Sequence, residues 1–212
     1  SRRLCHTAWL NSKATKMGIF SGSYGSIQEV CRVRFASTAD LARAVGSCLA
    51  SSPDGDCTDG PHGPIGEWDV SRVTDMNKMF DDASYFNADI SKWDVSRVST
   101  MSTIFLGATS FNGDLSRWDV SRVVDMSAMF WGAEAFNSDI STWHVSRVTD
   151  MVGTFAKAYS FDCDLSKWGV TSVSDMSRMF SDAKAFNGDL STWDVSSVTT
   201  MTNMLGSAAS FN

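Results

Sequence analysis

Side chains that commonly perform catalysis are few and widely separated in this 212-residue sequence. The three histidines, His6, His62 and His144, stand apart from one another, and neither an H-E-x-x-H nor a C-x-x-C motif occurs. The glycine-containing segment at 22–26 has no lysine with which to hold a phosphate group. The sequence therefore argues against an enzyme, and it indicates no metal and no cofactor.

A column of aspartates is the pattern that most resembles a metal site. The motif F-N-x-D, with Asp162 in place of the Asn in one copy, recurs every 25 residues and gives Asp89, Asp114, Asp139, Asp164 and Asp189. Stacked carboxylates could bind Ca²⁺, but each occurrence offers only two such side chains, fewer oxygen ligands than Ca²⁺ requires. Asn and Asp side chains also bond to nearby backbone and close turns. We therefore expect these aspartates to close turns.

The aromatic and methionine residues show that the same period runs through the chain. Ten of the 11 methionines and 11 of the 13 phenylalanines follow it. A constant step of 25 also separates six tryptophans: Trp68, Trp93, Trp118, Trp143, Trp168 and Trp193. A fixed period of this length indicates structural repeats that stack on one another and share a continuous apolar core.

Each copy contains the pattern of a short helix and of a short strand. The spacing of one helix face predicts a helix over 73–83, on the residues Val73, Met76, Met79, Phe80 and Ala83. The alternation of Trp93 and Val95 predicts a strand over 91–95 whose apolar side chains point inward. Stacked strands lie about 4.8 Å apart and helices about 8 to 10 Å apart. We therefore expect a curved array with its strands on the concave side.

The repeated motifs resemble those of the BspA-family leucine-rich-repeat surface proteins, specifically the 25-residue mycoplasma-type lipoprotein surface repeat. The quoted features are the Trp, the paired Val, M-x-x-M-F and F-N-x-D, and the match covers about residues 37–212. The resemblance implies a right-handed leucine-rich-repeat-like α/β solenoid of 25-residue coils, each a short strand, a short helix and a turn, behind an N-terminal helical cap. It also implies a non-enzymatic surface or secreted module that binds proteins or matrix.

The chain divides into three parts by composition. Residues 1–36 form a basic arm with six basic side chains, and residues 37–66 form a helical cap followed by a Pro/Gly loop. The amphipathic pattern over 39–49 predicts a helix that begins after Ser37 or Thr38 and covers the first coil. Residues 67–212 form the repeat solenoid, with five full copies and a partial sixth.

Four of the five cysteines lie before the repeats, at Cys5, Cys31, Cys48 and Cys57. A secreted cap with two disulfides, in line with the resemblance, would explain this arrangement. Cys48 and Cys57 flank the loop and are the preferred pair, which leaves Cys5 and Cys31 for a second bridge. Spacing alone does not fix the pairing, and four reduced thiols in a cytosolic protein are the alternative. Cys163 is expected to be a lone thiol at a turn.

The positions on either side of each tryptophan vary, although the tryptophan itself does not. In a repeat protein, variable positions within a constant frame are where recognition is usually placed. We therefore expect a binding face on the concave side, formed by Lys92, Asp94, Arg117, Asp119, Thr142, His144, Lys167 and Asp194.

A second charged pattern consists of a column of arginines, each followed three residues later by a position that often holds aspartate. Exposed i,i+3 ion pairs are the favoured interpretation, and a strip for an anionic partner is the alternative. The residues concerned are Arg72, Arg97, Arg122 and Arg147 with Asp75, Asp125, Asp150 and Asp175.

These observations predict a protein-interaction or adhesion module that is extracellular or on the cell surface and binds a protein or a surface polysaccharide. The alternative is a structural accessory subunit of a larger complex, in an organelle lumen or associated with a membrane. The net charge of −6, carried by the repeats, argues against nucleic acid as a partner. No apolar run reaches the roughly 18 residues of a membrane-spanning helix.

Overall fold

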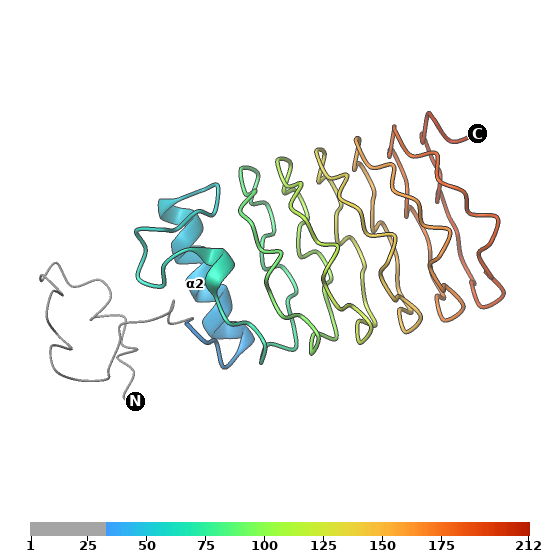
Figure 1. Cartoon of the computed structure of the whole chain (residues 1–212). Helices are drawn as coiled ribbons and strands as arrows, with labels where there is room; N and C mark the ends of the chain where they lie inside the picture. Colours follow the sequence, from blue (N-terminus) through green and yellow to red (C-terminus); the bar gives the residue numbers. More distant parts are fainter. Residues whose placement is uncertain (1–32) are drawn as a thin grey trace, which may run out of the picture.

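The computed structural model describes residues 33–212, which form one helix followed by a row of stacked coils (Figure 1). Helix α2 spans Thr38–Ser51 and lies at the N-terminal end of the row. The Ser37 hydroxyl accepts a hydrogen bond from the Asp40 N–H at 3.1 Å and thereby caps the helix. The helix expected over 39–49 is confirmed, and Ser37 is its cap.

The cap packs on the first coil through one face of α2. Leu41, Ala44, Val45 and Cys48 are buried on this face. The Thr38 hydroxyl donates to the Asp75 carbonyl of the first coil at 2.8 Å. A 3-10 helix, η1, spans Ile65–Glu67 and leads into Trp68. The cap therefore covers the N-terminal end of the apolar core.

The expected disulfide between Cys48 and Cys57 is present and ties α2 to the loop that follows it. The second expected pair, Cys5 and Cys31, lies outside the described residues, as does most of the basic arm. Cys163 is a buried free thiol, as predicted.

Successive coils are joined by parallel backbone pairing at a step of 25 residues. One isolated bridge links each coil to the next, in the series Asp75, Thr100, Asp125, Asp150, Asp175 and Thr200. Around these bridges, every second N–H of one coil donates to a carbonyl of the next. In the first coil the donors are Met76, Lys78, Phe80 and Asp82, at 2.7 to 3.2 Å from their acceptors.

The short helix predicted over 73–83 is wrong. This segment is a series of turns, closed by bonds such as Met79 N–H to the Met76 carbonyl at 3.3 Å. A helix would use its N–H groups internally, whereas here alternate N–H groups bond to the next coil. Left-handed residues reset the direction of the chain every four positions, with φ of 60° at Lys78 and 57° at Asp82. Tandem turns of this period bury the same residues as a helix face would.

The strand predicted over 91–95 is also wrong, because this segment is irregular and includes a turn at Ser91 and Lys92. The concave side was predicted because stacked strands lie closer together than stacked helices. The coils contain neither element, so this reason for a concave side no longer applies. The leucine-rich-repeat class and the right hand of the coil stay predictions.

Aromatic rings fill the interior in continuous columns. Neighbouring rings in the column from Phe80 to Phe180 have centroids 5.5 to 5.6 Å apart and are nearly parallel. A second column, from Phe86 to Phe211, has spacings of 5.6 to 6.0 Å. Within a coil the two columns touch, and the Phe80 and Phe86 centroids are 4.0 Å apart. Each coil thus completes the core of its neighbour.

Candidate functional site

The six tryptophans form the rigid frame on which the predicted binding residues sit. Each is buried, and its indole N–H donates to a backbone carbonyl earlier in the chain. In the middle of the row, Trp143 donates to the Leu115 carbonyl at 3.0 Å and Trp168 to the Ile140 carbonyl at 3.1 Å. Because the ring is held at both ends, by core packing and by this bond, the residues on either side of it have fixed positions.

All eight predicted binding residues are exposed beside this frame, in five successive coils. We call them the Trp-flanking strip: Lys92, Asp94, Arg117, Asp119, Thr142, His144, Lys167 and Asp194. The position before each tryptophan carries the cations, and the position after it carries mostly carboxylates. The strip therefore presents two parallel lines of unlike charge rather than one charged patch.

The carboxylates of the strip also shape the local backbone. Asp94, Asp119 and Asp194 each accept the N–H two residues further on, at 3.1, 3.0 and 3.0 Å. Hydrogen bonding by Ser121 lowers the pKa of Asp119, and bonding by Ser196 lowers that of Asp194. Asp119 and Asp194 are thus ionised and oriented at neutral pH. His144 takes the place of a carboxylate in its coil, with Nδ1 3.1 Å from the Thr142 carbonyl.

The cations of the strip differ in how far they are engaged. Lys92 Nζ pairs with Glu67 Oε1 at 2.7 Å. Within residues 33–212, Arg117 and Lys167 form no ion pair, although their charges help to lower the pKa of nearby Asp114 and Asp164. Arg117 and Lys167 are therefore the cations of the strip best able to meet a partner.

The five F-N-x-D aspartates close turns, as the sequence predicts. Each accepts the N–H of the serine two residues on, at 2.8 to 3.0 Å, and this bonding lowers its pKa. In the part of the chain that the structure describes, no group of three or more His, Cys, Asp or Glu could hold a metal ion.

The asparagines of the same motif do something that the sequence reasoning missed. We expected them to bond to nearby backbone, but they bond to the next coil. Asn87 Oδ1 accepts the Asn112 N–H at 2.9 Å, and Asn112 Oδ1 accepts the Asn137 N–H at 2.8 Å. The ladder continues through Asp162 and Asn187 to the last coil. The asparagine column therefore fixes the register between coils.

The expected i,i+3 ion pairs of the arginine column are wrong. The ion pairs among the described residues are Arg34–Asp69, Arg43–Asp40 and Lys92–Glu67. The aspartates instead accept backbone N–H groups two residues on, as Asp125 does from Ser127 at 2.8 Å. Burial, with the charges of Asp125 and Asp175, raises the pKa of Asp150. The arginines are exposed and take part in none of these ion pairs.

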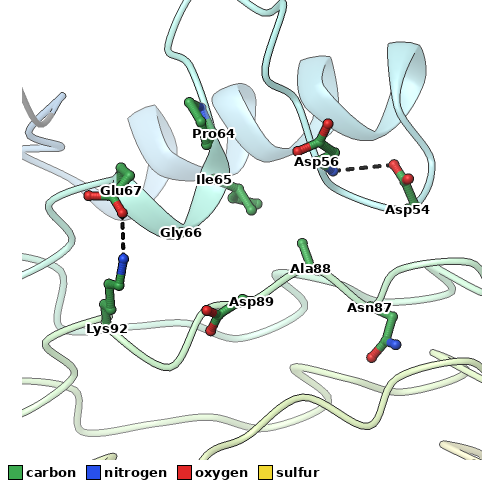
Figure 2. A pocket seen from close by; sticks show the side chains of 10 residues that line it. All are labelled: Asp54, Asp56, Pro64, Ile65, Gly66, Glu67, Asn87, Ala88, Asp89 and Lys92. Atoms are coloured by element: carbon green, nitrogen blue, oxygen red, sulfur yellow. Dashed lines mark hydrogen bonds and ion pairs between the residues drawn. The ribbon is translucent and has the colours of Figure 1, made fainter. Parts of the chain in front are cut away.

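A pocket adjoins the strip where the cap loop meets the first coil (Figure 2). It has a volume of about 460 Å³, and Lys92 belongs both to its wall and to the strip. Four carboxylates line it, those of Asp54, Asp56, Glu67 and Asp89, and Figure 2 shows the Glu67–Lys92 pair across its edge. The pocket is therefore acidic, with one engaged ammonium group.

Gly66 is required for the shape of this pocket. A Cβ at that position would lie 2.3 Å from the Asp89 carbonyl oxygen, so no other residue fits without movement of the backbone. The sequence reasoning did not find the pocket. Its one signal was Asp54 and Asp56, which lie in the segment that the sequence predicts only as a Pro/Gly loop.

The repeats match a known protein family. A family model described as "Mycoplasma protein of unknown function, DUF285" matches residues 56–151 and again, with overlap, residues 113–212. The chain belongs to this family. This membership is consistent with the resemblance of the chain's motifs to the mycoplasma-type surface repeat. No curated protein and no solved structure matches the chain.

Among the described residues, no helix has the length and apolar character needed to cross a membrane.

Proposed function

We propose that this DUF285 protein is a non-enzymatic interaction module, displayed at a cell surface or secreted, that binds a partner protein through the Trp-flanking strip. The observation that carries the proposal is the constant frame beneath a variable surface. Buried, hydrogen-bonded tryptophans repeat without change, while the exposed residues beside them differ from coil to coil. Such an arrangement supports recognition by a sum of contacts along the row.

The charges of the strip favour a protein over a polysaccharide. A uniformly charged polymer would meet attraction from one line of the strip and repulsion from the other. A folded protein can present acidic and basic groups together, so both lines can be matched. The acidic pocket extends this surface and suits a lysine or arginine side chain at the edge of the partner. A surface polysaccharide stays the second ligand class.

The disulfide supports an oxidising location. Cys48 and Cys57 are bonded in the cap, and such bonds persist in secreted and surface proteins but are rare in the cytosol. This agrees with the surface location that the resemblance implies.

The experiment is a pull-down from surface extracts with wild-type chain and two triple variants. The test variant carries Lys92→Glu, Arg117→Glu and Lys167→Glu. We expect it to retain the fold, shown by circular dichroism, and to lose captured protein. The matched control carries the same charge change on the exposed arginine column: Arg72→Glu, Arg97→Glu and Arg147→Glu. Equal capture by wild type and test variant, or equal loss in both variants, would reject the strip as the binding surface.

A second function, that of an accessory subunit docked in a larger assembly, is favoured by the basic composition of residues 1–36, which carry six basic side chains. Protease protection of residues 1–36 only in the presence of partners would support this function, and equal cleavage with and without them would remove it.

A further inference from the structure

The line of carboxylates that follows the tryptophans is interrupted in the middle of the strip. Asp94 and Asp119 belong to two successive coils, and Asp194 comes three coils after Asp119. Between them the equivalent positions hold His144 and Gly169, and both residues are exposed. We call these two positions the carboxylate gap. In this gap the line after the tryptophans carries no negative charge over two successive coils.

Folding gives no reason for the glycine in this gap. A Cβ at Gly169 would meet one atom within 4 Å, the Ser146 Cβ at 3.8 Å, which is an ordinary contact. Its φ lies outside the left-handed region, unlike that of Gly153 at 62°. Aspartate at the equivalent position accepts the N–H two residues further on, as Asp119 does from Ser121 at 3.0 Å. An aspartate at 169 would therefore fit and close a turn, so local stability favours the residue that is missing.

A cation borders the gap on the other side of the same tryptophan. Lys167 precedes Trp168, is exposed, and forms no ion pair within residues 33–212. The rings of Trp143 and Trp168 are stacked, with centroids 6.3 Å apart and planes 8° from parallel. This stacking holds the two coils in line, so that His144, Lys167 and Gly169 share one stretch of surface.

The carboxylates nearest to Lys167 are engaged with the backbone. Asp139 and Asp164 each accept the N–H of the serine two residues on, at 3.0 and 2.9 Å, and this bonding lowers their pKa values. The charge of Lys167 adds a smaller lowering to both. Lys167 thus acts on these carboxylates without pairing with them, and its ammonium group can meet a group from outside.

We propose that the carboxylate gap receives an acidic side chain of the partner protein, an aspartate or glutamate, which pairs with Lys167 beside His144 and Gly169. This inference rests on the proposed function of the strip and names the chemistry of its partner at one place. An aspartate at 144 or 169 would stand beside the incoming carboxylate and repel it. The gap therefore gives up a turn-closing bond for binding, since a residue that serves binding need not be the one that stabilises the fold most.

The first experiment separates charge from size at the gap. The test variant carries His144→Asp and Gly169→Asp, and its matched variant carries His144→Asn and Gly169→Asn. Both can form the turn-closing bond, but only the first adds charge. We expect both to melt at or above the temperature of the wild type, since replacement of glycine also restricts the unfolded chain. Capture of surface protein by the full chain should fall at least about tenfold with the aspartates and several-fold less with the asparagines.

A control variant adds the same two charges elsewhere on the row. Ser110→Asp and Ser160→Asp lie at exposed positions outside the strip. This variant should capture as much protein as the wild type does. A loss equal to that of the test variant would assign the effect to net charge and reject the gap.

The second experiment identifies the group that enters the gap. Carbodiimide coupling joins an ammonium group to a carboxylate that is in contact with it. We expect mass spectrometry of the coupled complex to find Lys167 joined to an aspartate or glutamate of the captured protein. Lys167 joined to a uronic acid, or to nothing in the captured material, would exclude an acidic side chain of a protein.

Two further results would overturn the inference. Equal capture by the test variant and the wild type, or equal loss by the aspartate and asparagine variants, would show that the missing carboxylates do not matter. A lower melting temperature of the test variant would show that His144 and Gly169 serve the fold. Full capture by the triple variant with glutamate at 92, 117 and 167 would reject the proposed function as well. Its loss of capture, together with full capture by the test variant, would reject the gap alone.

Discussion

Replacement of Trp143 by Phe tests the frame beneath the strip. The change removes one hydrogen bond, from the indole N–H to the Leu115 carbonyl at 3.0 Å. That carbonyl keeps its bond from the Trp118 backbone N–H at 3.0 Å, so the loss is that of an ordinary hydrogen bond, about 1 kcal/mol. Trp143 is only 3% exposed, and the missing part of its ring adds about 1 to 2 kcal/mol of lost packing.

We therefore expect Trp143→Phe to lower the free energy of unfolding by about 2 to 3 kcal/mol. The assay is urea unfolding followed by circular dichroism. Trp131→Phe is the matched control, because Trp131 is half-buried, lies outside the column and makes no indole hydrogen bond in the described structure. It should cost less than about 1 kcal/mol. Equal costs for the two variants would refute the reasoning.

Three further changes have defined outcomes. Thr103→Gly should raise the melting temperature, since Thr103 has a φ of 55° and its buried hydroxyl has no partner; an unchanged or lower value would show that this backbone is not strained. Val124→Thr should also raise it, because Thr or Ser at equivalent positions donates to the preceding coil, as Ser99 does to Thr74 at 3.1 Å; Val124→Ala is its control, and equal effects of the two would exclude a gained bond. The F-N-x-D aspartates have lowered pKa values in the folded state, so their contribution to stability is present at neutral pH and is lost as the pH falls below about 4. The melting temperature should therefore fall between pH 7 and pH 3, and a melting temperature that rises on acidification would contradict this.

The sequence correctly predicted the shared apolar core, the cap helix and the disulfide of the cap. Six tryptophans at one step predicted a shared core, and they are buried. Ser37 followed by an amphipathic segment predicted the cap helix, and the two cysteines around the loop are bonded. The first two predictions succeed because burial of apolar residues and capping of a helix are decided by residue type and spacing. The disulfide needed the family resemblance as well, since spacing alone does not fix the pairing.

The conformation of the coil was not readable, for a physical reason. Apolar residues at the spacing of 73–83 lie on one face both in a helix and in tandem turns, so the pattern does not separate the two. What separates them is competition for N–H groups between the same coil and the next, which appears only after stacking. The left-handed positions gave only a partial signal. Lys78 and Thr103 are not types that favour positive φ, whereas Asp82 and Gly107 are, and the sequence reasoning did not use them.

The candidate site was readable only in part. Alternation around a buried tryptophan correctly predicted that the eight strip residues are exposed. The asparagine ladder was missed because local backbone bonding is the commoner use of asparagine in a turn. The pocket was missed because it lies between the loop and the first coil, and the contact of Gly66 with Asp89 joins segments that no repeat pattern relates.

Hydrogen exchange of the indole N–H protons tests the stacked frame most directly, because one NMR spectrum reports every tryptophan. Trp93, Trp118, Trp143, Trp168 and Trp193 each bond to a carbonyl 28 residues earlier. We predict slow exchange for these five indoles and fast exchange for that of Trp131, which has no such bond. Fast exchange of all five at neutral pH would contradict the account, since it would mean that the coils do not hold one another in register.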